Sequence, residues 1–400
     1  MSRTTSEQMR AWKGPALLTY GFRPFFLGGA VWAALAMVLW VPMLAGALTL
    51  PTAFDPVSWH AHEFLFGYLT AVAAGFLLTA VPNWTGRLPI VGWRLGVLAV
   101  FWLVGRLAVA VSAELPAAAV AALDLAFPLL LALAIGREIV AGRNWRNLIV
   151  LALLAVLTLG NALFHWEAAR GGYAAQGAGL RLGLGAAIVM IGLIGGRIVP
   201  SFTRNWLIRR GAGRLPAPPM RRFDKIAMAG LILACLAWVA LPHALPTGLL
   251  LLFAGLLHLA RLARWCGHRT LAEPLVLVLH AGYLFLPLGA LAMGAEILWP
   301  GEFGSAGAQH LWMAGAVGLM TLAVMTRATL GHTGQTLTAG PATVAIYAAA
   351  IVAALARFAA GILPDEADWL VQAAGAAWVL AFAGYATVYG AALLRHRPPS

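Results

Sequence analysis

The chain has 400 residues, of which 62% are hydrophobic and only 10% are charged. Soluble globular chains are about a quarter charged, so this composition excludes a water-soluble fold. The formal net charge of +13 would suggest nucleic-acid binding in a soluble protein, but in a membrane protein lysine and arginine collect in cytoplasmic loops, and we expect no nucleic-acid partner.

Long hydrophobic stretches recur along the chain, and each approaches the roughly twenty residues that an α-helix needs to cross a bilayer. They predict an all-α, polytopic membrane protein of about 12 transmembrane helices. The high glycine content, 44 residues, is typical of closely packed transmembrane helices. The predicted spans, in chain order, are 25–46, 60–81, 94–112, 116–136, 146–167, 179–199, 226–242, 246–261, 274–298, 307–328, 341–362 and 368–394.

Basic residues alternate between the two ends of these spans. With the amino terminus in the cytoplasm, the predicted inner segments carry nearly all the arginines and lysines that lie outside spans, and the outer segments carry only Arg170 and Arg181. Because cytoplasmic loops are enriched in these residues, both the N and C termini are predicted to be cytoplasmic. The predicted location is the bacterial inner membrane, with the lipid bilayer as the surrounding partner.

We expect a single membrane domain over residues 1–400. A basic, proline-rich cytoplasmic loop at 197–225 divides it into two possible six-helix halves, 1–205 and 220–400. Only two cysteines, Cys235 and Cys266, are present, which is too few for a disulfide framework. The sequence contains no Cys-x-x-Cys-His motif, so covalent c-type haem is excluded.

Histidines in or next to the predicted spans form two layers. Ionisable residues are costly inside a bilayer and by default mark a functional site or a pathway, and neutral imidazole binds copper, zinc and haem iron. The alternative for any one of them is a hydrogen bond across a helix interface. The outer layer comprises the metal-ligand candidates His60, His62, His165 and His310. The inner layer comprises His258, His280 and His332.

The most informative segment of the outer layer is Trp59-His60-Ala61-His62-Glu63. Side chains two residues apart on a helix point about 200° apart, so two such histidines cannot easily bind one ion. Either this end is not yet helical and both histidines bind one metal, or the helix lies between two cofactors and each histidine serves one. Glu63 is expected to orient a ligand imidazole or to carry protons as a catalytic residue, the alternative being a polar interfacial side chain.

The inner layer predicts a b-type haem. His258 and His280 lie at similar depth on adjacent predicted helices, and facing each other they would be its axial ligands. His332 is a third haem-binding candidate. Arg327 would pair with a haem propionate, although the bias of basic residues to the cytoplasmic side explains it equally well. Asp124 lies inside a predicted span with no identifiable partner, and a part in a proton route is left open.

Five segments carry a family resemblance. They are 20–26 (YGFRPFF), 59–63 (WHAHE), 75–87 (GFLLTAVPNWTGR), 196–205 (GRIVPSFTRN) and 325–334 (MTRATLGHTG). Spread over nearly the whole chain, they resemble the NnrS family of bacterial membrane proteins. The resemblance implies a twelve-span protein that contains haem and copper and is produced with the denitrification and nitric-oxide response. It does not identify ligands residue by residue.

The resemblance leads to one main hypothesis and two alternatives. The main hypothesis is a protein with one or two b-type haems and copper that binds nitric oxide, reduces it with electrons from a quinol or a cytochrome, and so relieves nitrosative stress. Nitric oxide is neutral and lipid-soluble, so a site within the membrane needs no polar entry channel. The alternatives are a non-enzymatic sensor or sink for nitric oxide, and a transporter of metal, haem or a metal–nitrosyl complex.

Overall fold

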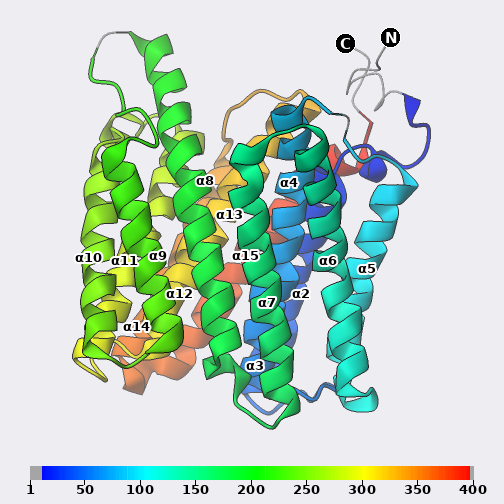
Figure 1. The fold of residues 1–400 in the computed structure, drawn as a ribbon, viewed down its shortest axis with the longest axis vertical. Helices are drawn as coiled ribbons and strands as arrows, with labels where there is room; N and C mark the ends of the chain where they lie inside the picture. Colours follow the sequence, from blue (N-terminus) through cyan, green and yellow to red (C-terminus); the bar gives the residue numbers. More distant parts are fainter. Residues whose placement is uncertain (1–10, 88, 212, 397–400) are drawn as a thin grey trace. The chain divides into compact units, whose positions relative to one another are not determined.

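The computed structural model describes residues 11–87, 89–211 and 213–396, and these residues contain helices and no strand. Twelve of the helical segments are long and apolar enough to cross a membrane, which confirms the predicted all-α, polytopic fold (Figure 1). The placement of the two ends of the chain on one side of the membrane stays a prediction, which follows if all twelve segments cross it. That this side is the cytoplasm stays a prediction. The spans are α2 (Phe22–Leu44), α3–η2–α4 (Pro56–Thr85), α5 (Trp93–Ala110), α6 (Ala117–Ala141), η4–α7 (Trp145–Ala169), α8 (Ala178–Arg210), α9 (Arg222–Ala240), α10–η6 (Leu245–Arg269), α11 (Pro274–Leu298), α12–η7–α13 (Ser305–Thr333), α14 (Pro341–Ile362) and η8–α15 (Pro364–Leu394).

The helices form two compact units. Unit 1 comprises Met1–Gly183, Ala328–Thr336 and Phe382–Ser400. Unit 2 comprises Leu184–Arg327 and Leu337–Ala381. Unit 1 therefore contains α2 to α7 together with one end each of α8, α13 and α15, and unit 2 contains the remaining helices.

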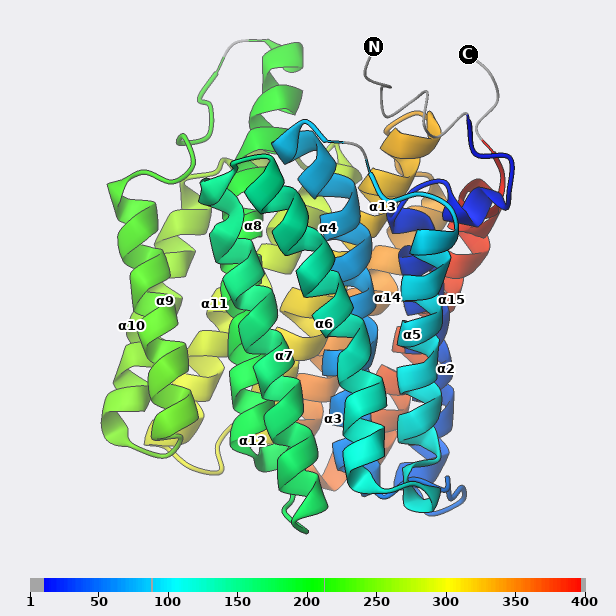
Figure 2. The same cartoon turned by 45° about the vertical axis from the view of Figure 1, so that its right-hand side comes forward.

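The span Pro56–Thr85 is the central element of unit 1. Its α4 packs against α2 and α6, and its η2 packs against α2, α5 and α7 (Figures 1 and 2). Its most apolar stretch is 83% buried, against 39% for α2 and for α5. Polar side chains on this span therefore face protein and not lipid.

The central span starts earlier than hydropathy predicts, at Pro56 and not at residue 60. Asp55 caps it, because its Oδ1 accepts hydrogen bonds from the backbone amides of Val57 and Ser58 at 3.0 and 2.9 Å. Pro56 occupies the first helical position, where its fixed φ suits the helix and no amide is needed. Both histidines of the Trp-His-Ala-His segment therefore lie on regular helix, α3 (Pro56–His62).

A π-helical segment, η2 (Glu63–Tyr68), follows α3 directly and leads into α4 (Leu69–Thr85). Its wider turn leaves backbone carbonyls for side chains, and Trp102 Nε1 of α5 donates to the carbonyl of Gly67 at 2.9 Å. Within unit 2 a second π-helix, η7 (Leu311–Leu319), directly follows His310. Short π-helices inside α-helices occur frequently at functional sites, so η2 directs attention to its neighbours.

Arg23 fastens the end of α15 (Ala367–Leu394) inside unit 1. Its Nη1 donates to the carbonyl oxygens of Leu393 and Arg395 at 2.8 and 2.7 Å and to that of Ala392 at 3.2 Å. The side chain is only 2% exposed. A cation that binds the last carbonyls of a helix also meets the negative end of the helix dipole, so this contact stabilises the carboxyl end of α15.

In unit 2, α10 packs against both α9 and α11, and η7 packs against α11 and α14. Arg261 of α10 links these helices through buried contacts. Its Nε donates to Oδ1 of Asp224 on α9 at 2.8 Å, which forms an ion pair, and its Nη1 donates to the hydroxyl of Tyr283 on α11 at 2.8 Å. The connection predicted at 197–225 is helical at both ends, since α8 continues to Arg210 and α9 begins at Arg222.

Candidate metal site

The site begins at His62, the last residue of α3, whose side chain is fully buried. Its Nδ1 lies 3.1 Å from Glu63 Oε1. Its Nε2 lies 3.2 Å from Asp124 Oδ2 and 3.0 Å from Asn161 Oδ1. Because the carboxylate of Glu63 can only accept, Nδ1 donates to it, and this bond turns Nε2 toward Asp124.

Asp124 of α6 is the point where the neighbouring side chains meet. Its Oδ2 accepts a hydrogen bond from Asn161 Nδ2 at 2.7 Å and lies 3.0 Å from Nε2 of His165. Asn161 and His165 are four residues apart on α7 and therefore project from the same face of that helix. Two helices, α3 and α7, thus bring polar atoms to one carboxylate oxygen of α6.

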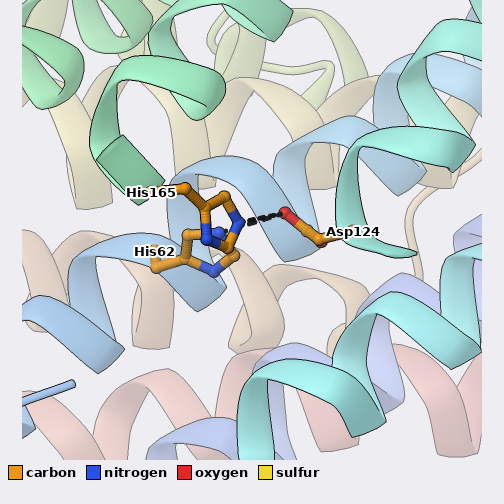
Figure 3. Close-up of side chains that lie close together, drawn as sticks. All are labelled: His62, Asp124 and His165. Atoms are coloured by element: carbon orange, nitrogen blue, oxygen red, sulfur yellow. Dashed lines mark hydrogen bonds and ion pairs between the residues drawn. The ribbon is translucent and has the colours of Figure 1, made fainter. Parts of the chain in front are cut away.

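His62, Asp124 and His165 converge in Figure 3, and one potential ligand atom from each lies within 4.8 Å of the other two. Ligands of a tetrahedral ion at about 2.0 Å are about 3.3 Å apart, so small side-chain movements close this group around a metal. Two imidazole nitrogens and one carboxylate oxygen suit copper, zinc or iron. The donor set therefore fits a transition-metal ion.

Aromatic rings enclose the cluster. The rings of Phe54, Phe66 and Phe164 each lie with their centroids 5.5 Å from that of His62. The exposed fractions of Asp124 and His165 are 2% and 6%. The cluster is therefore dry, and charges within it interact more strongly than they would in water.

Glu63 and Arg106 form a second layer behind the three converging residues. Arg106 Nη1 donates to Glu63 Oε1 and Oε2 at 2.8 and 2.7 Å. Arg106 Nη2 donates to Asp124 Oδ1. Trp32 Nε1 of α2 donates to Glu63 Oε2 at 2.7 Å. One guanidinium therefore bridges the carboxylate behind His62 and the carboxylate that faces both histidines.

Gly67 of the π-helix makes room for that guanidinium. A Cβ at this position would lie 2.3 Å from Arg106 Nη1 and 2.9 Å from Glu63 Oε2. Neither separation is compatible with non-bonded contact, so a glycine is required where Arg106 passes the central helix. The positions of the Arg106 and Glu63 charges therefore depend on the close approach of η2 at Gly67.

Of the predicted outer-layer residues, the structure brings together His62, His165 and Glu63. It separates His60 from them: the His60 ring stacks on Trp40 at a centroid distance of 4.0 Å, on another face of α3. This divergence follows from the two-residue spacing of His60 and His62 on a regular helix.

His310 belongs to unit 2. It is the last residue of α12 (Ser305–His310), and its Nδ1 lies 2.6 Å from the carbonyl oxygen of Ala306. The preceding turn of its own helix therefore supplies this contact. The His62, Asp124 and His165 group lies wholly within unit 1 and does not include it.

His258 of α10 is hydrogen-bonded through both ring nitrogens. Its Nδ1 lies 2.8 Å from the hydroxyl of Tyr283, and its Nε2 lies 3.1 Å from the carbonyl oxygen of Ala227. Arg261 donates to the Tyr283 hydroxyl, so that hydroxyl directs its own hydrogen to Nδ1, and Nε2 carries the hydrogen that Ala227 accepts. Binding of iron by His258 would break one of these two bonds.

His280 of α11 differs from His258. Its Nε2 lies 2.8 Å from the hydroxyl of Thr203. Its Nδ1 is buried and has no hydrogen-bond partner among the described residues, and the side chain as a whole is 6% exposed. An unpaired buried nitrogen of this kind suits a further ligand.

The remaining two residues predicted to bind haem, His332 and Arg327, belong to different units. His332 belongs to unit 1, where its ring centroid lies 5.4 Å from those of Tyr20 and of Phe22. Arg327 belongs to unit 2, where its guanidinium lies 4.1 Å from the ring centroid of Phe202. Each is in contact with aromatic side chains of its own unit.

Three residues of the cluster were not predicted from the sequence: Arg106, Asn161 and Trp32. Asp124 was noted without a partner. A comparison of depth along the helices identifies Arg106 as a partner for Asp124. Arg106 lies four residues before the end of α5, and Asp124 lies seven residues after the start of α6. The two residues are therefore about 6 and 11 Å from the turn that joins these helices. Two opposite charges at similar depth on consecutive helices predict an ion pair.

Comparison with models of protein families gives a match over nearly the whole chain. A family model described as NnrS protein matches residues 16–397, a range that includes all twelve spans and every residue of the cluster. A search of the curated proteins finds no match.

Proposed function

The chain belongs to the NnrS family, and from that premise we propose that it is a copper- and haem b-binding protein of the nitric-oxide response, located in the bacterial inner membrane. The observation that supports the copper site is the convergence of His62, Asp124 and His165 inside unit 1. These residues fit copper, for which imidazole is a favoured ligand. Oδ2 of Asp124, which His62, Asn161 and His165 surround, would be the oxygen ligand of the ion.

The residues of the cluster have distinct roles in this proposal. His62 and His165 bind copper through Nε2, and Asp124 binds it through Oδ2. Glu63 holds the imidazole of His62 by the bond to Nδ1, as carboxylates behind metal-bound histidines commonly do. Trp32 and Arg106 in turn fix Glu63 with three hydrogen bonds, so we assign Glu63 to orientation of the ligand.

The surroundings of the site suit nitric oxide as the ligand. A bound copper ion would supply a coordination position for it. Nitric oxide is neutral and dissolves in lipid, so it reaches a dry cluster between transmembrane helices without a polar channel. The rings of Phe54, Phe66 and Phe164 offer an apolar approach and keep water and hydrated anions away from the cluster.

Haem b is proposed at His280, the inner-layer histidine whose buried Nδ1 lacks a partner among the described residues. His258 stays a proposed second axial ligand, and binding of iron would replace one of the hydrogen bonds of its ring nitrogens. Arg327, also of unit 2, stays proposed as the partner of a propionate. His332, of unit 1, stays proposed as a ligand of a separate, second haem. If nitric oxide is reduced, a quinol or a cytochrome would supply the electrons.

Metal analysis and optical spectroscopy of the purified protein test this proposal. We expect copper in the wild type and its loss in His62→Ala, Asp124→Asn and His165→Ala, with haem absorption retained. His280→Ala should lose haem absorption and retain copper. Replacement of the exposed His243, in the turn between α9 and α10, by alanine is the matched control and should change neither. Absence of both cofactors from the wild type, or copper content unchanged in all three cluster variants, would overturn the proposal.

Anaerobic assays separate an enzyme from a sink. With a reduced electron donor in excess, a reductase removes nitric oxide continuously, whereas a sink removes one amount that matches its binding sites. Consumption that exceeds the protein concentration many times over and is absent from Asp124→Asn supports reduction at this cluster.

A further inference from the structure

Arg106 is the only guanidinium bonded to the cluster in the described part of the chain, and it contacts both carboxylates. It is 3% exposed, while Glu63 and Asp124 are 0% and 2% exposed. Its Nη1 is shared between the two oxygens of Glu63, and its Nη2 donates to Asp124 Oδ1. Because these side chains are buried, solvent screens their charges weakly, so the net charge of the group bears on which ion it accepts.

The formal charges give a simple balance. Glu63 and Asp124 carry one negative charge each, and Arg106 carries one positive charge. A histidine that binds a metal must be neutral, so His62 and His165 add no charge in the metal-bound state. The residues around a bound ion therefore carry one net negative charge. A monovalent ion makes it neutral, whereas a divalent ion leaves one uncompensated positive charge in a dry interior, which is unfavourable.

Arg106 also limits how Asp124 binds. The bond to Oδ1 uses one of the two carboxylate oxygens, so only Oδ2 faces His62 and His165. Binding through both oxygens, which larger and harder divalent ions favour, is thereby disfavoured. The remaining donors are two imidazole nitrogens and a single oxygen, a set that binds copper and zinc alike. The charge balance, and not the type of ligand, therefore distinguishes the two ions.

We propose that Arg106 is the specificity-determining residue of this site and that it selects a monovalent over a divalent ion, Cu(I) over Zn(II). The inference rests on the proposed copper site and adds to it which oxidation state the protein favours and which residue imposes that preference. Arg106 touches no reacting atom and acts through its charge and through the orientation of Asp124.

Competition binding tests the inference. Purified, metal-stripped protein is titrated anaerobically with Cu(I) and, separately, with Zn(II) against chromophoric chelators, and the ratio of the two affinities is measured. The same titrations are repeated with His62→Ala, and the binding that this variant retains is subtracted, so that the difference reports binding at the cluster alone. In Arg106→Gln the ratio of Cu(I) to Zn(II) affinity should fall at least about tenfold, because a divalent ion then meets two uncompensated carboxylates. Arg106→Lys keeps the charge and should preserve most of the wild-type ratio.

Two further variants separate an effect of charge on the affinity ratio from an effect of misfolding. Arg23→Gln removes another buried guanidinium of unit 1, one that donates to main-chain carbonyls of α15, and should leave the ratio unchanged. Glu63→Gln removes a negative charge and should shift the ratio in the opposite direction, toward Cu(I), even if Arg106→Gln does not fold.

The outcomes distinguish the two proposals. A wild type that binds neither ion in a His62-dependent manner refutes the copper site itself. Cu(I) binding that depends on His62, combined with the same ratio in the wild type, Arg106→Gln and Glu63→Gln, refutes the role of Arg106 and leaves the copper site standing. Opposite shifts in the two charge variants support the inference.

Discussion

Gly67→Ala is the substitution that most directly tests the coupling between the π-helix and the charged cluster. The new Cβ would lie 2.3 Å from Arg106 Nη1, so the guanidinium must move by about 1 Å to reach ordinary contact distance. That movement stretches the two hydrogen bonds from Arg106 to Glu63, now 2.8 and 2.7 Å, beyond useful length. Loss of charge-assisted hydrogen bonds in a buried site costs about 2–3 kcal/mol, even if the ion pair re-forms partly at longer distance.

The assay for Gly67→Ala combines stability with metal content. We expect the free energy of unfolding, measured in mixed micelles by denaturant titration, to fall by about 2–3 kcal/mol, and copper uptake to fall with it. Gly390→Ala in α15 is the control, since the nearest neighbour of a Cβ there would be Leu27 of α2, at 3.9 Å. If Gly67→Ala were as stable as Gly390→Ala and took up copper normally, Arg106 would not be confined by the central helix and the reasoning would fail.

Two further predictions concern stability. Asp55→Ala removes the cap of α3 and should lower the free energy of unfolding by about 1 kcal/mol, whereas Asp55→Asn, which keeps an acceptor, should cost much less in the same thermal melts. Arg261→Gln leaves the buried carboxylate of Asp224 without its partner in unit 2 and should cost about 3–5 kcal/mol, while Arg94→Gln at the surface should change stability by less than about 0.5 kcal/mol. An Arg261→Gln variant that melts like the wild type would show that the pair is not needed for the fold.

The fold was predictable because each crossing of a bilayer demands a long apolar helix, and that demand is visible in hydropathy. The ends of the helices were harder to predict from the sequence. The central span begins at Pro56 because Asp55 caps it, and α8 continues to Arg210, well past the predicted end at 199, because a helix continues beyond the membrane in polar residues. Hydropathy carries no signal for either feature, nor for the π-helix η2.

The site was predictable in part. His62, His165 and Glu63 stood out because ionisable side chains are expensive in a bilayer. The point at which they meet was not predictable, because it depends on how α3 packs against α6 and α7, and α4 and α5 separate α3 from these helices along the chain. Arg106 lies within the predicted span 94–112 but was given no role, although its charge is opposite to that of Asp124 and the two residues lie at a similar depth.

Burial and charge compensation in this cluster depend on each other. Each of Glu63, Asp124 and Arg106 would be unfavourable alone in the interior of unit 1, and each is tolerated because the others are in place. The helices that carry them, η2, α5 and α6, bring the three charges together where they pack against one another. The same packing holds the imidazoles of α3 and α7 beside Asp124. Folding of unit 1 therefore forms the ligand group and compensates its charges together.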